Sequence, residues 1–418
     1  ILFAILPTLP LILKSDGMLK SHVQVVLTYS LSLTSLILYL LSLFLTTLSF
    51  TNEIKYKQFY LIDTKPVNRY FFFLGKFFGI AIINFVFLFA MSFIILIGII
   101  FLVNYSGNKD ERIQVKEQIF TAYLPCKPEI DIALINARVE REFQERKNKR
   151  QISEDYNEVE VKKALRMLVY QQIQSVQFGN KHSWNFANVP KNNEKLKLKY
   201  KFFASEASYG FIGKLRFEIG HGSQKYVVED RVRVGEFIEF TIPGNVVDSE
   251  NMVTVTFMHI DKDAGRIYFP VENGIQLFYV ASNFYVNYFK SFVLIYIISC
   301  FLTILALFAS TFLTFPVAVL FEIMILLLGT ISNFIVSISS GVVDSEKTPF
   351  FSLFQKILFY IIPNFSNYAP LDYLSTAQVI EWNTIIICVL DLIIFRGGIL
   401  AIVGCFIFYY REVGKPLS

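Results

Sequence analysis

Histidine, cysteine and acidic side chains are the groups through which this chain could bind a metal or act as a nucleophile. The four histidines are far apart in the sequence: His22, His182, His221 and His259. Metal or nucleophile motifs of the H-E-x-x-H, paired C-x-x-C and G-x-S-x-G types are absent. His259 is predicted to end a β-strand, and Asp261 and Asp263 to lie in a solvated turn. We therefore expect neither a catalytic residue nor a metal site in this chain.

The composition is that of a membrane protein with a polar domain inserted into it. Of the 418 residues 54% are hydrophobic and only 17% are charged, whereas a soluble chain carries about 25% charged residues. Residues 105–285 hold 26 of the 39 Lys and Arg and 24 of the 34 Asp and Glu. Cys126 is the one cysteine of this segment, which excludes a disulfide within it. The small net charge of +5 does not indicate a nucleic-acid partner.

Apolar runs predict six membrane spans, the first of them incomplete, because a bilayer core requires about 20 apolar residues per helix. The first is Ile1–Leu13, which is expected to be the tail of a helix whose beginning is absent, and the second and third are Val23–Thr51 and Phe77–Asn108. The fourth and fifth follow Lys290, are separated by a turn at Pro316 and end near Gly341. The sixth is Thr384–Tyr410. The fold class is therefore an α-helical polytopic membrane protein. The predicted domains are 1–104, the inserted 105–285 and 286–418, with a loop at 51–76.

Basic residues orient the predicted spans, because short cytoplasmic loops carry an excess of Lys and Arg. The loop after the second span contains Lys55, Lys57, Lys65, Arg69 and Lys76, and the C-terminus contains Arg411 and Lys415. We expect both chain ends in the cytoplasm and residues 105–285 outside. The apolar segment 345–375, broken by Lys356, Pro363 and Pro370, is expected to be an external re-entrant or interfacial element.

The inserted domain has two periodicities. Apolar residues three and four positions apart predict helices within 111–178: Ile132, Ile135, Val139 and Phe143, and then Leu165, Val169, Ile173 and Val176. From Lys195 the period becomes two, as in Leu196, Leu198, Tyr200 and Phe202. Some seven short strands of this kind predict an antiparallel β-sandwich over 180–281.

Three charges fall within the predicted spans, where charged groups are costly and mark pairing or function. They are Glu322, Asp391 and Arg396. The last two are about 140° apart on an α-helix, so we expect them on different faces, with Glu322 as the candidate partner of Arg396. The alternatives are that Arg396 reaches the membrane surface or that Gly397 and Gly398 break the helix there.

The first cytoplasmic loop has the residues of a short amphipathic element. Phe59, Ile62 and the run Phe71–Phe73 are expected in the membrane interface, with Lys65 and Arg69 towards the cytoplasm. On composition alone, this loop is better interpreted as a basic anchor that fixes the orientation of the chain. The order of its residues carries more information than its composition.

That order resembles the permease subunit of type-2 ATP-binding-cassette exporters, in the variant with a large external domain between the third and fourth spans. The matching residues are Glu53, Lys65, Pro66, Val67, Arg69, Gly75 and Lys76, with Ile362–Phe365 and Phe408–Val413 further along. The resemblance covers the predicted membrane part, and the insertion of 105–285 departs from the shorter family pattern.

The resemblance implies that the loop is a coupling helix that docks into a separate ATPase subunit. The docking residues would be Asn52, Glu53, Phe59, Ile62, Lys65, Pro66, Arg69 and Lys76. ATP and Mg would bind the ATPase, since this chain has no G-x-x-x-x-G-K-[ST] loop. The remaining implied partners are a second permease subunit and lipids of a bacterial cytoplasmic membrane.

Two other functions remain open at this stage. A membrane-anchored binding or assembly protein would act through the external sandwich, and it would have no need of Glu53 or of the order Lys65-Pro66-Val67-x-Arg69. A secondary transporter would be expected to carry polar residues at mid-membrane and repeated halves, and the sequence shows neither.

Overall fold

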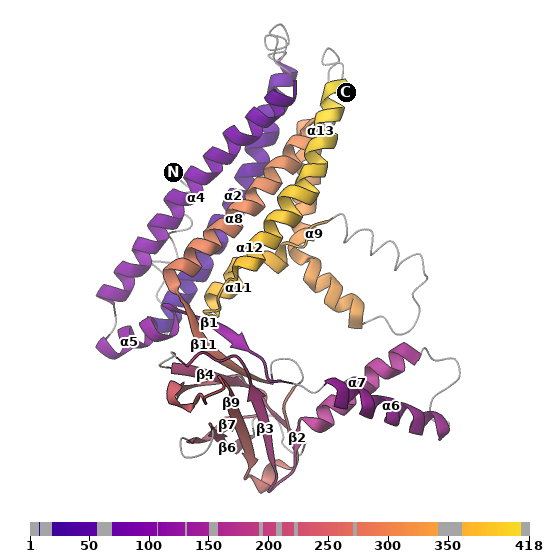
Figure 1. Cartoon of the computed structure of the whole chain (residues 1–418). Helices are drawn as coiled ribbons and strands as arrows, with labels where there is room; N and C mark the ends of the chain where they lie inside the picture. Colours follow the sequence, from indigo (N-terminus) through magenta and orange to yellow (C-terminus); the bar gives the residue numbers. More distant parts are fainter. Residues whose placement is uncertain are drawn as a thin grey trace. The chain divides into compact units, whose positions relative to one another are not determined.

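The computed structural model describes residues 8, 19–56, 69–106, 108–129, 132–149, 158–191, 195–205, 211–220, 225–270, 274–341 and 362–410. The chain divides into two compact units, which are described separately (Figure 1). The membrane unit comprises Ile1–Ala122 and Ser282–Ser418, and the polar unit comprises Tyr123–Ala281. The helix α5 (Lys109–Gln118), which the sequence analysis places in the inserted domain, belongs to the membrane unit.

Within the described residues, five helices are long and apolar enough to cross a membrane. They are α2 (Leu19–Lys55), α4 (Arg69–Tyr105), α8 (Phe284–Ser310), α9 (Phe315–Gly341) and a last span built from α12 (Trp382–Cys388), η5 (Val389–Gly397) and α13 (Gly398–Tyr410). The chain is thus a multi-pass membrane protein. The sixth predicted span, Ile1–Leu13, lies outside the described residues.

α2 and α4 are longer than a bilayer requires. Each has 37 residues, which at 1.5 Å per residue is about 55 Å, against a hydrocarbon core of about 30 Å. α2 ends and α4 begins on either side of residues 57–68, and we call this end of the two helices the loop end. The helical segments therefore extend into the predicted loop 51–76, because α2 continues to Lys55 and α4 starts at Arg69.

α8 is the central helix of the membrane unit and contacts α2, α4, α9 and α13. Most of its side chains are buried, including Leu294, Phe301 and Leu305. The turn between α8 and α9 falls at Thr311–Thr314, and Pro316 is the second residue of α9. Proline is well tolerated there, because the first-turn amides of a helix have no intrahelical partner. The predicted end of this helix at Gly341 is confirmed.

Two short elements pack at the end of the spans opposite the loop end. The described part of the predicted segment 345–375 forms η4 (Phe365–Tyr368) and α11 (Pro370–Ser375), and 345–361 lies outside the described residues. Asn287 of α8 holds the chain after α11, donating to the Gln378 carbonyl (2.7 Å) and accepting from the Ile380 amide (2.7 Å). Lys290 donates to the Ile380 carbonyl at 2.7 Å.

The polar unit is built on antiparallel pairs of short strands, as predicted. The strands are β1 (Thr121–Cys126), β2 (Ser175–Val176), β3 (Lys181–Phe186), β4 (Lys195–Tyr200), β5 (Phe203–Ala204), β6 (Ile212–Ile219), β7 (Tyr226–Arg233), β8 (Ile238–Pro243), β9 (Val253–His259), β10 (Ile267–Tyr268) and β11 (Ile275–Asn283). Two four-stranded sheets have the orders β1-β11-β4-β8 and β3-β9-β6-β7, and a three-stranded sheet has the order β2-β10-β5. The turns η2 (Gly244–Val246) and η3 (Lys262–Ala264) follow β8 and β9.

One hydrophobic core joins the two larger sheets. Leu198 and Tyr200 of β4, Phe217 of β6 and Phe257 of β9 are at most 1% exposed and belong to the same buried cluster. The period of two puts alternate side chains on one face of each strand, so every second residue enters this core. The intervening Lys197 and Lys199 of β4 lie outside it.

The predicted helical segment 111–178 is wrong in part, because it contains the strand β1. β1 is an edge strand that includes Pro125, and proline is accepted at an edge because its missing amide costs no ladder bond. The helices are α6 (Ile132–Asn148) and α7 (Glu158–Ile173). Ile132 is 68% exposed, and Val176 lies in β2 and in the sheet core, so neither packs between these helices as predicted.

The polar unit should fold by itself. We expect residues 121–283, from the start of β1 to the end of β11 and without α5, to be soluble when expressed alone and to melt cooperatively at the same temperature with and without reductant. Cys126 is the only cysteine of this segment, its thiol donates to the Ala187 carbonyl at 3.2 Å, and burial raises its pKa. Differential scanning calorimetry checks this. A melting point that falls with reductant would show an intermolecular disulfide, and an insoluble product would show that the fold needs the spans.

Candidate functional site

The loop end is where the structure brings predicted docking residues together. Asn52 and Glu53 lie in the last turn of α2, and Lys76 lies two turns into α4. Lys76 forms an ion pair with Glu53 and donates to the Ser49 hydroxyl at 2.9 Å. Arg69 is the first residue of α4. The other predicted docking residues lie outside the described residues: Phe59, Ile62, Lys65 and Pro66.

The Glu53–Lys76 pair ties α2 to α4 across the loop. The two side chains are 24% and 22% exposed, so the pair is shielded on most sides. From the sequence, Glu53 and Lys76 are predicted only as separate contacts for a partner. They meet because both helices continue beyond the apolar runs and pack along each other, which a loop assignment for 51–76 does not allow.

An aromatic cluster adds a third helix to the loop end. Phe50 of α2 lies 5.2 Å from Phe408 of α13 between ring centroids, and Phe72 of α4 lies 6.0 Å from the same ring. Phe73 is 1% exposed and packs against Phe50, so its predicted place in the membrane interface is wrong. Because α4 is helical from Arg69, successive side chains are rotated by about 100° around the helix axis. Of the run Phe71–Phe73, only Phe71 therefore faces outward.

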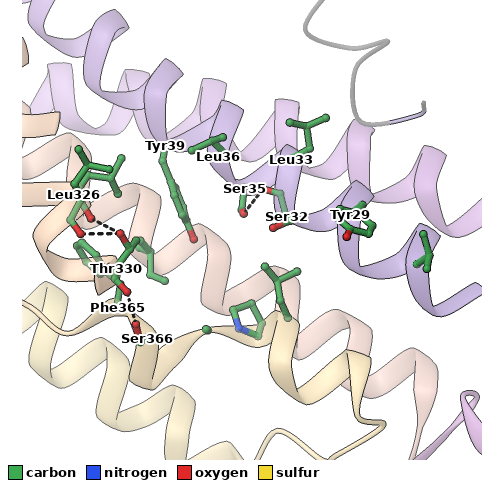
Figure 2. Close-up of a pocket in the computed structure, with 16 residues that line it drawn as sticks. Tyr29, Ser32, Leu33, Ser35, Leu36, Tyr39, Leu326, Thr330, Phe365 and Ser366 are labelled. Atoms are coloured by element: carbon green, nitrogen blue, oxygen red, sulfur yellow. Dashed lines mark hydrogen bonds between the residues drawn. The ribbon is translucent and has the colours of Figure 1, made fainter. Parts of the chain in front are cut away.

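A groove runs between α2 and α9 and is closed below by η4 and α11 (Figure 2). Its volume is about 670 Å³, and its lining is mostly apolar. The lining residues are Val25, Tyr29, Ser32, Leu33, Ser35, Leu36, Tyr39, Ile298, Leu326, Leu327, Thr330, Phe365, Ser366, Ala369, Pro370 and Leu371.

Three hydroxyls in the groove are already bonded to backbone carbonyls. Ser35 donates to the Ser32 carbonyl at 2.8 Å, Thr330 to the Leu327 carbonyl at 2.8 Å, and Ser366 to the Thr330 carbonyl at 2.7 Å. Figure 2 shows the last bond joining η4 to α9. The hydroxyl-bearing side chains of Tyr29, Ser32 and Tyr39 also line the groove. Because the lining is nevertheless mostly apolar, the groove suits a hydrocarbon group better than a sugar or a peptide backbone.

A buried polar layer crosses three spans. Ser42 of α2 shares a hydrogen bond of 2.9 Å with Ser299 of α8, and the Asn84 amide of α4 donates to Ser42 at 2.9 Å and to Thr303 at 3.3 Å. All four side chains are fully buried. The expectation that mid-membrane polar residues are absent is therefore wrong. Each looks isolated within its own apolar run, and only helix packing gathers them into interhelical bonds.

Asp391 and Arg396 form an ion pair with each other, contrary to the prediction. The Arg396 Nε donates to Asp391 Oδ1 at 2.9 Å, and the Tyr368 hydroxyl donates to Asp391 Oδ2 at 3.2 Å. The reason is that Val389–Gly397 is a π-helix, in which residues five apart are hydrogen-bonded neighbours. The geometry of an α-helix, on which the prediction rested, does not apply to this segment.

Glu322 contacts α2 and not Arg396. Its carboxyl group is fully buried, and the Thr47 hydroxyl lies 2.8 Å and 3.0 Å from its two oxygens. Among the residues that the structure describes, no Lys or Arg forms an ion pair with it. Glu322 thus joins α9 to α2 through one threonine, on the side of α2 that also carries the buried Thr51, one turn further along the helix.

The titratable groups singled out in the polar unit are structural. His259 ends β9 as predicted, and its Nε2 lies 2.8 Å from the Gly265 carbonyl. Asp261 accepts from the amides of Lys214 (2.8 Å) and Asp263 (3.1 Å), so it caps the turn and is not merely solvated. No group of three His, Cys, Asp or Glu side chains able to hold a metal is found in the described ranges.

Comparison of the chain with protein-family models, with curated proteins and with solved structures finds no match.

Proposed function

We propose that this chain is the membrane-spanning permease subunit of an ATP-driven exporter. In this proposal an ATPase subunit docks on residues 52–70, and a second permease subunit completes the translocation path. ATP and Mg are bound by the ATPase, so this chain performs no chemical step. In this proposal the loop end lies in the cytoplasm of a bacterial cell and the polar unit lies outside. The excess of Lys and Arg around the loop end supports this orientation.

The observation that carries the proposal is the reinforced loop end. A loop that only anchors the chain needs no fixed geometry between the helices beside it. Here the Glu53–Lys76 ion pair joins α2 to α4, the two helices beside the loop. The contacts of Phe50 and Phe72 with Phe408 join both of these helices to α13. A partner that moves the loop therefore moves α2, α4 and α13 as a body. This is the property that a coupling element requires.

The groove between α2 and α9 supports a path for an apolar cargo. It is built from spans and from η4 and α11, and it is lined mainly by leucine and aromatic side chains. α2 takes part in both features, since its middle lines the groove and its last turns form the loop end. Motion imposed on the loop would thus reach the groove along one continuous helix, which is stiff because its backbone bonds are internal.

A pull-down tests the docking surface. The change Phe59→Ala with Arg69→Ala should release the ATPase from the purified complex, because interfaces concentrate their energy in a few aromatic and Arg anchors that cost about 2 kcal/mol or more each when truncated. The matched control is Phe89→Ala with Lys109→Ala, an aromatic and a basic residue exposed on α4 and α5. The control should copurify with stoichiometric ATPase.

Two results would contradict the proposal at different levels. If the Phe59→Ala, Arg69→Ala variant retains the ATPase and transport-coupled hydrolysis, the docking surface lies elsewhere. If the wild-type chain extracted gently from its native membrane brings down no ATPase, the exporter assignment fails. A membrane-anchored binding protein that acts through the polar unit then becomes the better account.

A further inference from the structure

The last span contains a nine-residue π-helix, η5 (Val389–Gly397), between the α-helical segments α12 and α13 (Figure 1). π-turns are rare, and when they occur inside α-helices they are frequently at functional sites. Two features of this segment favour the π register over the α register. One is an ion pair and the other is a glycine.

The ion pair joins residues five apart. Asp391 Oδ1 accepts from Arg396 Nε at 2.9 Å, which is possible because the π-turn stacks position i+5 above position i. On an α-helix the two side chains would be about 140° apart and the pair would be broken. Both side chains are more than two-thirds buried, at 29% and 20% exposed, so the pair is poorly screened.

The glycine is required by the same register. A Cβ atom at Gly397 would lie 2.7 Å from the Leu392 carbonyl, five residues earlier, and 3.1 Å from Cδ1 of Ile304. At the neighbouring Gly398 the nearest contact of a Cβ atom would be the Ile393 carbonyl at 3.8 Å, an ordinary van der Waals distance. The π-turn therefore excludes a side chain at residue 397 and accepts one at residue 398.

We propose that the last span is a register switch, in which the segment 389–397 exchanges between a π register and an α register. The observed π register is favoured by the Asp391–Arg396 pair and by Gly397. In the α register that pair is broken and α13 is turned about its axis. A membrane permits this exchange because both registers keep the backbone amides bonded within the helix. Unwinding would instead leave amides without partners in the bilayer.

The switch would connect the two parts of the candidate site. Tyr368, which donates to Asp391, belongs to η4, the element that also lines the groove through Phe365 and Ser366. At its other end α13 carries Phe408 into the aromatic cluster with Phe50 and Phe72. A displacement of η4 that weakens the ion pair would therefore turn α13 and move Phe408 at the loop end. The proposal concerns this helix alone and does not depend on the exporter assignment.

Disulfide cross-linking reports the register. Gly404 of α13 faces α8, where its Cβ position lies 3.4 Å from Cα of Phe308. The parent protein is the full chain in nanodiscs with Phe308→Cys and Gly404→Cys, and with Cys300, Cys388 and Cys405 replaced by alanine. Oxidation should link residues 308 and 404, as measured by mass spectrometry of the joined peptides.

Adjacent glycines give the test its matched control. Gly397→Ala should lower the cross-link yield about tenfold, since overpacking a tight site by one methyl group shifts a two-state equilibrium by that order. Gly398→Ala should leave the yield unchanged. Adding Ile304→Val, which removes Cδ1, should not restore the Gly397→Ala yield, because the carbonyl clash remains. Equal yields for the two alanine variants, or restoration by Ile304→Val, would overturn the proposal.

A double variant tests the proposal in the case in which Gly397→Ala does not yield a monodisperse protein. Asp391→Asn keeps the size of the side chain, Arg396→Gln keeps a polar but shorter one, and together they remove both charges and the ion pair. The yield should fall at least about threefold, since a partly buried pair contributes more than an exposed one. An unchanged yield in this variant would show that the pair does not hold the register, and the switch would be rejected.

Discussion

Phe217→Ala is expected to lower the free energy of unfolding of the polar unit by about 3–5 kcal/mol, the usual cost of removing a buried phenylalanine. Phe217 is 1% exposed and lies at the centre of an aromatic cluster that spans both larger sheets. Its ring centroid is 4.8 Å from Tyr200, 5.3 Å from Phe257, 6.1 Å from Phe240 and 6.4 Å from Phe269. No neighbouring backbone is free to close the cavity, because β6 is paired on both sides.

The measurement is thermal unfolding of residues 121–283. For a unit of this size a loss of that magnitude lowers the melting temperature by roughly 6–20 °C. Phe237→Ala is the matched control, because Phe237 is 52% exposed and its ring lies 5.0 Å and 4.9 Å from the Lys199 and Lys201 ammonium nitrogens. It should cost about 1 kcal/mol or less. Equal shifts for the two variants would mean that the two sheets do not share a core.

Thr47→Val is expected to destabilise the membrane unit by about 1–3 kcal/mol, the cost of leaving a buried polar group without its hydrogen bond. The threonine hydroxyl is the partner of the fully buried Glu322 carboxyl, at 2.8 Å and 3.0 Å from its oxygens. Valine has nearly the same shape, so packing between α2 and α9 is kept and only the bond is lost. Thermal unfolding of the purified chain in nanodiscs measures the change.

The neighbouring threonine provides the control. Thr46 donates only to the Ser42 carbonyl of its own helix, at 2.5 Å, and that carbonyl lies within the α2 hydrogen-bond ladder. Thr46→Val should therefore be nearly neutral. Adding Glu322→Leu to Thr47→Val should recover most of the loss, because replacing both partners by apolar groups removes the unsatisfied group. If Thr46→Val and Thr47→Val destabilise equally, Glu322 has its main partner elsewhere.

The elements that follow from local patterns could be predicted from the sequence. The apolar runs give α2, α4, α8, α9 and the last span, because a bilayer requires long, predominantly apolar segments. The alternation from Leu196 onwards gives the antiparallel strands, because a strand with one buried face repeats every two residues. Helix ends were less accurate, as the extension of α4 back to Arg69 shows, since polar residues continue a helix that neighbouring helices stabilise.

The contacts that make up the candidate site were decided by the tertiary structure. Glu53 and Lys76 are 23 positions apart, and Ser42 and Ser299 are 257 positions apart, so no local pattern marks either pair. Asp391 and Arg396 are close enough in the sequence for helix geometry to predict whether their side chains meet. The prediction assumed an α-helix, in which they lie on different faces, whereas the π-helix brings them together. Composition and periodicity determine that the chain spans a membrane and carries a β domain. Which polar groups meet depends on helix packing and backbone register, because a buried polar group takes whichever partner the fold places within hydrogen-bond distance.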